Sequence, residues 1–503
     1  MEAGGCGYHP PVAVDELPRS EADDATRGSA VKLAAEVVSR LLAAAMPFLV
    51  LRRLGAAEFG RFGELQVVAL LVAELGELGL SNLASRALVA GTATLGSFLR
   101  ARLLASALVG LAALAAVPLA PVLDRRAGSG PPDGVGLALL IAWFALSGWA
   151  EFLGVALRCR GARRHEALVL LALRSAAPAS VAAVLLGGAG LPGVCGALAL
   201  SPLPAIALGA LLLRSTRPAA SAPAVPATRV LRESAPLAVH GALLLLSPRV
   251  EFLVLSSLRH GSSEVGFFYA ALNVVWPLGM VPAAVTAGAM PALTREAGRR
   301  LAGADRTAAA GGSVRARTAA TLALLGAPAA VGLALVAPEL SRLLLRASAG
   351  QALTASTMQI AAAAVPALFQ NAVVASALIA VGRARWLPWL TAARVAFAFA
   401  LASLLVPLLG ARGAAAGFVA AEWLLLALGS AACRRAGFAV PVARPLVWSL
   451  LACVPMALAV SGVAGSLPAA LAIGGLTWAA TLAAAARLKP ALVRQLTGDL
   501  RYP

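Results

Sequence analysis

The chain has 503 residues, of which 60% are hydrophobic and 13% are charged, and its mean hydropathy is +0.84. A soluble domain carries roughly 45–50% apolar and about 25% charged residues, whereas apolar runs long enough to cross a bilayer recur along almost the whole of this chain. The composition excludes a soluble enzyme and a disulfide-built secreted domain. It predicts an all-α polytopic membrane protein.

Basic residues outnumber acidic ones, with 42 Lys and Arg against 23 Asp and Glu, a formal net charge of +19. They are spread between the apolar runs rather than gathered in one soluble patch, so we expect no binding of nucleic acid. The only two lysines, Lys32 and Lys489, lie outside any GxxxxGK[ST] loop, the loop that cradles nucleotide phosphates. An ATP-driven pump within this chain is thereby excluded.

Cysteine and histidine give no sign of a metal site. The cysteines form no CxxC pair, and the histidines have no metal-ligand spacing. We therefore expect no bound metal and no cofactor, apart from a coupling ion such as H⁺ or Na⁺. These residues are Cys6, Cys159, Cys195, Cys433, Cys453, His9, His165, His240 and His260.

The chain opens with residues 1–30, which are polar, acidic and rich in proline. They lack the basic start and short apolar core of a signal peptide, so we expect a disordered cytoplasmic tail. About fourteen apolar spans follow. Their predicted ranges are 31–52, 62–85, 98–120, 135–157, 167–187, 191–213, 233–257, 265–289, 318–337, 353–381, 386–409, 413–433, 445–463 and 467–487.

The spans fall into two lobes of six helices each. Residues 31–213 form the predicted N-lobe, 214–232 a cytoplasmic linker and 233–433 the C-lobe. Residues 434–503 supply two further spans and a short cytoplasmic tail. With the N-terminus inside, 29 Lys and Arg lie on the cytoplasmic side and 9 on the other, as the positive-inside rule requires. The preference for Arg over Lys, together with many Ala, Gly and Pro, is typical of a GC-rich bacterium. We therefore expect a multi-pass protein of the bacterial inner membrane with both termini in the cytoplasm.

Two short motifs recur in the same order. The pattern G-x-x-E-[FV]-G-x-F occurs at 55–62 and again at 261–268, and the pattern G-x-x-G followed by small residues occurs at 190–193 and 410–413. The repetition predicts two halves with the same orientation, related by an axis along the membrane normal, as in secondary transporters. The acid of the first motif, Glu58 or Glu264, is expected to open the next helix, where the dipole favours negative charge.

Four arginines lie inside predicted spans: Arg40, Arg174, Arg249 and Arg394. An arginine at the bilayer centre costs about 2.5–3.5 kcal/mol on insertion scales unless it finds a partner or a wet cavity. One hypothesis is a symmetric cationic chamber between the lobes that binds the substrate. The alternative is that each arginine pairs with an acid or extends to the headgroups.

The neighbouring residues that could compensate the charge differ among these arginines. Glu36 lies four residues before Arg40 and can neutralise it. Arg249 follows Pro248, which bends a helix and frees a carbonyl. Glu251, two residues on, points elsewhere, so it and Arg249 each need another partner.

Acidic residues of the spans are candidates for coupling to H⁺ or Na⁺, foremost Glu251, Glu36 and Glu422. Each could equally balance one of the arginines, and that alternative stays open. Glu74 and Glu151 are further acids of the spans, and Glu77 is interpreted as a helix-end residue.

Several segments together resemble the Wzx-like polysaccharide flippases of the multidrug/oligosaccharidyl-lipid/polysaccharide exporter superfamily. The resemblance covers about residues 31–433, and two more spans fit the fourteen-span members of the family. It assigns cavity roles to Arg40 and Arg249 through their spans, and it places Glu251 where the family usually has Asp. The segments that carry the resemblance are 51–60, 77–80, 249–253, 264–271, 282, 290–291 and 410–417.

The resemblance implies a non-enzymatic flippase that translocates polyprenyl-pyrophosphate-linked oligosaccharide by alternating access for cell-surface polysaccharide export. Arginine suits that anionic headgroup because guanidinium binds phosphate oxygens bidentately. The implied partners are the lipid-linked oligosaccharide, the bilayer and other polysaccharide-assembly proteins.

Other functions remain as alternatives. An ion-coupled drug or cation exporter of the same superfamily would favour an acidic, aromatic-lined chamber, whereas the deep unpaired charges here are mostly positive. A peptidoglycan-precursor lipid flippase is a closer alternative. A membrane glycosyltransferase or polymerase is disfavoured because the predicted outward loops are too short to hold a catalytic domain. Nothing in the sequence points to a passive scaffold.

Overall fold

A computed structural model describes residues 45–77, 79–89, 92–124, 134–216, 223–260, 262–301, 313–345, 350–462 and 466–488. Every regular element in these ranges is a helix. Eleven of the described helices are long and apolar enough to cross a membrane. The prediction of an all-α polytopic membrane protein is confirmed.

The described helices follow the predicted spans. Of the first predicted span, 31–52, only 45–52 is described, and it belongs to a helix that continues to residue 54. The predicted tail 1–30, and with it Glu36 and Arg40, lies outside the described residues. The N-lobe continues with α2 (Ala56–Glu77), α3 (Leu80–Val89), α4 (Leu95–Asp124), α5 (Gly134–Cys159), α6 (Arg163–Leu186), α7 (Leu191–Leu200) and α8 (Leu203–Ser215).

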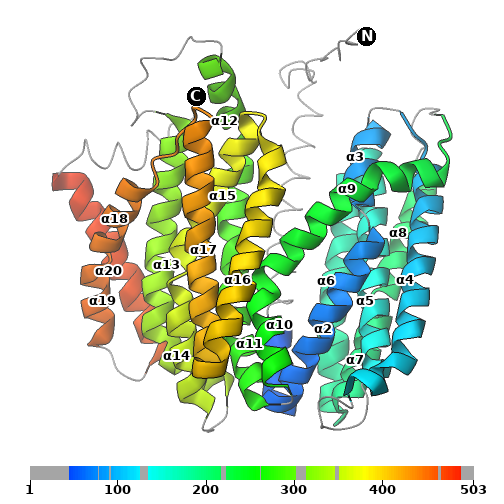
Figure 1. Cartoon of the computed structure of the whole chain (residues 1–503), viewed down its shortest axis with the longest axis horizontal. Coiled ribbons are helices and arrows are strands. Elements are labelled where there is room, and N and C mark those ends of the chain that lie inside the picture. The colour runs from blue at the N-terminus through cyan, green and yellow to red at the C-terminus, as the bar shows by residue number, and fades with distance from the viewer. Residues whose placement is uncertain are drawn as a thin grey trace.

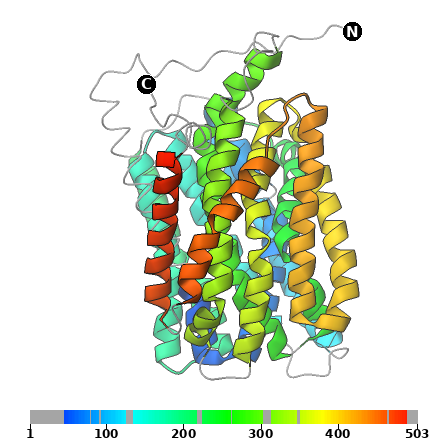
Figure 2. The ribbon, with the colours of Figure 1, turned by 90° about the vertical axis from the view of Figure 1, so that its left-hand side faces the viewer.

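Prolines break several spans of the second half into two helices. The elements of this half are α9 (Ala227–Leu246), η2 (Ser247–Arg249), α10 (Val250–Leu258), α11 (Ser263–Val275), η3 (Trp276–Gly279), α12 (Met280–Leu301), α13 (Val314–Leu344), α14 (Gly350–Ala362), α15 (Val365–Ala380), η4 (Ala384–Trp386), α16 (Leu387–Leu409) and α17 (Ala411–Arg435). Pro248 in η2 and Pro277 in η3 mark two of these breaks, because proline lacks the N–H that a continuous helix needs. The last helices are α18 (Ala443–Ala452), α19 (Val454–Ser461) and α20 (Leu467–Leu488), which pack on α13 at the outer side of the second bundle (Figure 2).

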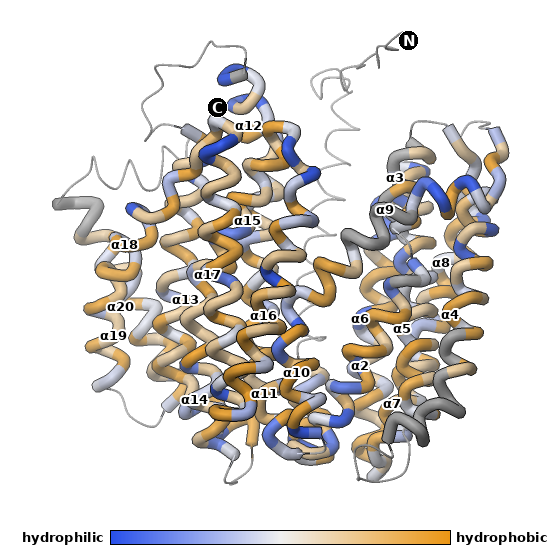
Figure 3. Tube along the Cα trace, viewed as in Figure 1, coloured by the Kyte–Doolittle hydropathy of each residue, from blue (hydrophilic) through white to orange (hydrophobic). Residues whose placement is uncertain are grey.

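The helices form two bundles that meet at one end and diverge toward the other (Figure 1). Hydrophobic residues cover most of the helix shafts, and hydrophilic residues gather mainly near the helix ends (Figure 3). By the charge distribution, the end where the bundles meet is the predicted exterior side. The diverging end is the predicted cytoplasmic side.

The first repeated motif builds the contact between the bundles. Glu58 and Glu264 stand in the first turns of α2 and α11, as predicted, and these two helices pack on each other across the lobes. A Cβ atom on Gly60 would lie 2.8 Å from the backbone nitrogen of Gly266, and one on Gly266 would collide with the carbonyl oxygen of Ala56. Glycine is therefore required at this crossing, because the two backbones approach too closely for a side chain.

Side chains complete the closed end. The phenol of Tyr269 on α11 donates a hydrogen bond to Gln66 on α2 at 2.7 Å, and its ring lies 5.0 Å from that of Phe59. His260 and Glu64 approach to 3.3 Å nearby. These contacts join the two lobes over several turns of α2.

The span that joins the lobes in sequence is also divided between them. Its first half, α9, packs chiefly on α2, α3 and α4 of the N-lobe, and its second half, α10, packs on α16 and α17 of the C-lobe. Helix α9 begins at Ala227, inside the predicted linker 214–232. The start of α9 is stabilised by the hydrogen bond that Arg229 donates to Glu233 at 2.9 Å, an i,i+4 pair on the helix surface.

Candidate functional site

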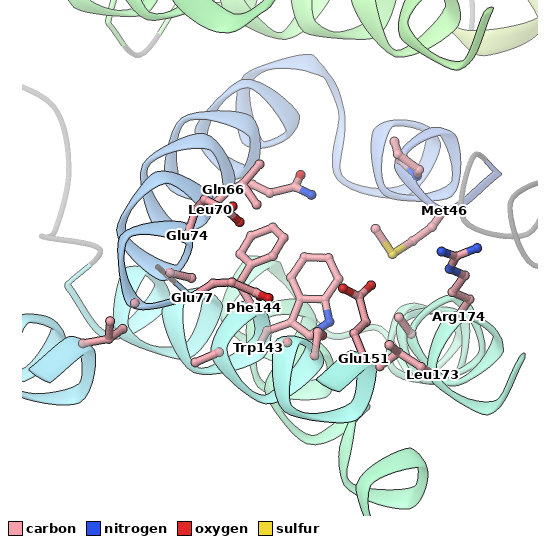
Figure 4. A pocket seen from close by; sticks show the side chains of 18 of the residues that line it. Met46, Gln66, Leu70, Glu74, Glu77, Trp143, Phe144, Glu151, Leu173 and Arg174 are labelled. Atoms are coloured by element: carbon pink, nitrogen blue, oxygen red, sulfur yellow. The ribbon is translucent and has the colours of Figure 1, made fainter. Parts of the chain in front are cut away.

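A cavity of about 590 Å³ lies between the lobes. Most of its wall comes from α2, α4, α5 and α6 of the N-lobe (Figure 4). The C-lobe contributes the segment around η3, including Asn273 and Trp276. Its charged lining residues are Glu74, Glu77, Glu151, Arg102 and Arg174, and its aromatic ones are Trp143, Phe144 and Trp276.

Helical spacing explains why these side chains converge. On α2 the lining residues Gln66, Leu70, Glu74 and Glu77 are separated by four, four and three positions, which places them on one helix face. On α5, Phe144, Gly148 and Glu151 follow the same rule, as do Arg102, Ser106 and Val109 on α4. Each helix thus presents one mixed face of polar and apolar residues to the cavity.

Arg102 and Glu77 form an ion pair in the wall, with 3.4 Å between Nη2 and Oε2. Arg102 is only 4% exposed, and its guanidinium lies 5.1 Å from the ring of Phe152. Gly148 makes room for it, since a Cβ atom there would lie 2.5 Å from Nη2 of Arg102. Glu77 ends α2 and also accepts a hydrogen bond from Ser81, so its predicted helix-end role is accompanied by a place on the cavity wall.

The remaining charges face the interior more openly. Glu151 of α5 and Arg174 of α6 both point into the cavity near Met46 (Figure 4). Glu74 lies against Gly241 of α9, where a Cβ atom would be 3.2 Å from its Oε1. With three carboxylates and two guanidinium groups, the wall has a mixed charge. The cationic chamber, one of the two hypotheses from the sequence, does not include these carboxylates.

Of the four predicted arginines, Arg174 lines this cavity, and Arg40 lies outside the described residues. Arg249 sits just behind the wall. Its Nη1 donates to the carbonyl oxygen of Leu245 at 2.7 Å, and its guanidinium carbon lies 5.1 Å from the centre of the Trp276 ring, which faces the cavity. None of the described carboxylates is within ion-pair distance of Arg249.

Arg394 lies elsewhere, in contrast to the symmetric chamber predicted from the sequence. It is fully buried in the C-lobe, and its Nη2 lies 3.1 Å from Glu251 on α10 and 3.1 Å from Glu422 on α17. Two acids from other helices therefore hold it away from the cavity, the arrangement that the alternative of acid pairing describes. Glu251 and Glu422, the described candidates for ion coupling, belong to this buried cluster as well.

Arg102 is a cavity residue that the sequence analysis does not single out, because it lies near the start of the predicted span 98–120 and is counted with the cytoplasmic basic residues. Helix α4 instead begins at Leu95, where the Oγ1 of Thr94 accepts a hydrogen bond from the backbone N–H of Ser97 at 3.3 Å. Threonine before a helix is a known start signal. This start places Arg102 two turns into α4, deeper in the helix than the predicted start at residue 98 does.

The described residues include no group of three or more His, Cys, Asp or Glu side chains that could hold a metal ion. No protein-family model and no curated protein matches the sequence.

Solved structures do match. The lipid II flippase MurJ in an inward closed conformation superposes with a TM-score of 0.71 at 14% identity, over 92% of this chain and 99% of that one. An inward-facing multidrug resistance MATE family transporter of the MOP superfamily gives 0.60 at 17% identity, over 81% and 98%. A MOP superfamily transporter from Pyrococcus furiosus gives 0.57 at 16% identity, over 81% and 93%. The chain has the fold of these transporters. The similar structures named here are flippases and transporters, not enzymes.

Proposed function

We propose that this protein is a flippase that carries a polyprenyl-pyrophosphate-linked oligosaccharide from the inner to the outer leaflet of the bacterial inner membrane. The observation that carries the proposal is the cavity between the lobes, which brings guanidinium groups to a space enclosed by membrane-spanning helices. An arginine is stable at such depth only beside a partner or a polar cavity. The pyrophosphate of a lipid carrier is a partner of matching charge.

Two arginines are the proposed contacts of the headgroup. Arg174 lines the cavity directly. Arg249 is held by a carbonyl and a tryptophan ring rather than by a carboxylate, so its charge is available to an anion that reaches Trp276. Guanidinium binds phosphate oxygens through two parallel N–H donors, which fixes the orientation of the headgroup.

Transport in this proposal follows alternating access, with binding between the lobes and rocking of one lobe against the other. The lobes are closed at the predicted exterior end by α2 and α11. Opening that crossing while the cytoplasmic ends approach would expose the headgroup to the outer leaflet. The lipid tail would remain in the bilayer. Energy would come from H⁺ or Na⁺ coupling, and other polysaccharide-assembly proteins would supply and remove the substrate.

The proposal is tested with the full chain in proteoliposomes and a fluorescent polyprenyl-pyrophosphate oligosaccharide. Arg249→Ala is expected to lower the initial translocation rate at least tenfold, the loss of one charge-assisted contact. Arg299→Ala, on the last turn of α12, is the matched control and should keep the wild-type rate. Translocation by Arg249→Ala at the wild-type rate would contradict the assignment.

A second function is favoured by a specific feature of the same cavity. An ion-coupled exporter of organic cations would need acidic and aromatic lining, and the wall carries Glu74, Glu77 and Glu151 together with Trp143, Phe144 and Trp276. Aromatic faces and carboxylates are the usual partners of ligand cations. The same proteoliposomes loaded with a lipophilic cationic dye distinguish the two functions, because Glu74→Gln should abolish dye export but leave the pyrophosphate contacts of Arg249 intact.

A peptidoglycan-precursor flippase is the nearest variant of the first proposal, since the structure with the higher TM-score is a lipid II flippase. Lipid II and other polyprenyl-pyrophosphate saccharides share the charged group and differ in the sugar. Competition of each unlabelled lipid against the fluorescent substrate ranks the sugars. A strong preference for lipid II would identify this variant.

A further inference from the structure

The C-lobe contains a buried cluster with more acids than bases. Glu251, Arg394 and Glu422 come from α10, α16 and α17, and their exposed fractions are 0%, 0% and 7%. Nη2 of Arg394 lies 3.1 Å from Oε1 of Glu251 and 3.1 Å from Oε1 of Glu422. Nε of the same arginine also donates to Glu422 at 3.2 Å.

A neutral amide is the other polar neighbour. Asn371 of α15 donates to Oε2 of Glu422 at 2.9 Å and to its carbonyl oxygen at 3.2 Å. Glu422 is therefore well supplied with donors, from Arg394 and from Asn371. Glu251 has fewer donors: both of its carboxylate oxygens are buried, and Arg394, at 3.1 Å, is the described side chain within ion-pair distance of them.

The charged groups on the helices packed around the cluster are engaged elsewhere. Arg249, next to α10, donates to Leu245 and stacks on Trp276. Glu264 of α11 accepts from the N–H of Ala411, and the phenol of Tyr269 donates to Gln66. Arg412 of α17 donates to Ser356.

Two more charged groups lie at the end of α17, too far from the cluster to contribute to its charge. Arg434 and Arg435 stand in the last turn of α17, at least three helical turns beyond Glu422. Among the described side chains, Arg394 is the cation within ion-pair distance of Glu251, and it also contacts Glu422.

The cluster therefore has one more carboxylate than it has cations. With all groups ionised, it would hold an uncompensated negative charge in a dry protein interior, where the loss of hydration is not repaid. Two carboxyl groups that share a site avoid this by keeping a proton between them. The uncompensated negative charge would lie at the carboxyl group with fewer hydrogen-bond donors, which is Glu251.

We propose that the Glu251–Arg394–Glu422 cluster binds one proton, so that the buried site is neutral. The remaining ionised carboxylate balances Arg394. The inference does not depend on which lipid the cavity accepts, and it gives the C-lobe an ion-binding site separate from that cavity.

The location of the site connects its charge to the arrangement of the lobes. Glu251 is in the first turn of α10, immediately after the break at Ser247–Arg249, beyond which α9 packs on the N-lobe. Loss of the proton would strengthen the attraction between Glu251 and Arg394 and add repulsion from Glu422. Both changes act on the first turn of α10, the second half of the span that joins the lobes.

The experiment measures the infrared absorption of protonated carboxylic acid in the full chain, reconstituted without substrate at neutral pH. The wild type should show a band of buried protonated carboxyl groups, of which one carboxyl per molecule belongs to the cluster and is identified by its loss in the two variants. Both Glu251→Gln and Glu422→Gln should lose the cluster's share of the band completely, because either change leaves one carboxylate for one guanidinium. Should one of the two variants fail to fold, the other carries the same prediction, and the wild-type band itself is measured in either case.

Glu296→Gln is the matched control. Glu296 is also buried, with 5% exposure, but it lies outside the cluster and pairs with Arg315 at 3.7 Å, so its removal should leave the band unchanged. The proposal is overturned if the wild type shows no such band, if the band is undiminished in both variants, or if Na⁺ at constant pH removes the cluster's share of it. The last result would assign the site to a metal cation. Because no substrate is present, failure here is distinct from failure of the flippase proposal.

Discussion

Arg394 shows how buried acids compensate for the cost of placing a charged residue in the membrane. An intramembrane arginine is expensive, and the sequence therefore marked it as functional, but the cost is met equally well by a cavity or by buried acids. The acids that hold it, Glu251 and Glu422, lie on other helices. Local spacing cannot reveal such partners, which is why the sequence left both alternatives open for each arginine.

Replacing that arginine should be costly for stability. Arg394→Gln leaves the buried carboxyl groups of Glu251 and Glu422 without a cation, and we expect it to destabilise the fold by about 3–5 kcal/mol, as breaking buried ion pairs does. Arg342→Gln removes an arginine whose side chain is 60% exposed in its pair with Glu339, and its effect should stay within about 0.5 kcal/mol. Thermal unfolding of both variants in detergent, followed by tryptophan fluorescence, compares them. Similar unfolding midpoints would show that the buried cluster does not stabilise the lobe.

Among the elements, the helices were largely predictable and their mutual contacts were not. Apolar runs and prolines are local signals, so the spans appear where expected, including the bend at Pro248. The repeated glycine motif predicted the starts of α2 and α11 correctly. It did not reveal that its two copies cross each other at Gly60 and Gly266, because contact between distant segments has no signature in a single sequence.

That crossing predicts the effect of a single methyl group. In Gly266→Ala the new Cβ would collide with the carbonyl oxygen of Ala56, so the closed exterior end should be destabilised relative to the open one. Spin labels on the exposed residues Arg53 and Arg412, one on each lobe, should report a longer mean separation. Gly110→Ala in α4, where no atom lies within 4 Å of the new Cβ, is the control and should leave the separation unchanged. An unchanged separation in Gly266→Ala would mean that the helices can shift without opening.

For the whole molecule, the central question is whether the two lobes move relative to each other. The cavity and its lining could not be derived from the sequence, because Glu74, Arg102, Trp143 and Arg174 converge from different helices and only their arrangement creates the site. The acids and the one predicted arginine on this wall were recognised as intramembrane charges. That these charges lie on one cavity wall could be seen only in the folded structure.

A cross-link between the lobes tests the motion. Glu64 and His260 approach to 3.3 Å across the closed end, so cysteines at both positions, joined by a short bifunctional thiol reagent in a background without native cysteines, should abolish translocation. Reduction of a cleavable reagent should restore it. Cysteines in place of Ser356 and Arg412, which contact each other at 2.9 Å within the C-lobe, should cross-link without loss of transport. Full activity of the locked Glu64–His260 pair would exclude rocking at this end.

The divided span between the lobes has a consequence for how the protein is assembled. If the chain were cut near residue 220, midway between the two repeats, the first fragment would lack α9, the helix that covers α2 and α4. The second fragment would carry α9 without the N-lobe helices on which it chiefly packs and would keep its contact with α16. The two repeats in the sequence and the two bodies in space are thus offset by half a span, and the first fragment is complete only when the second supplies α9.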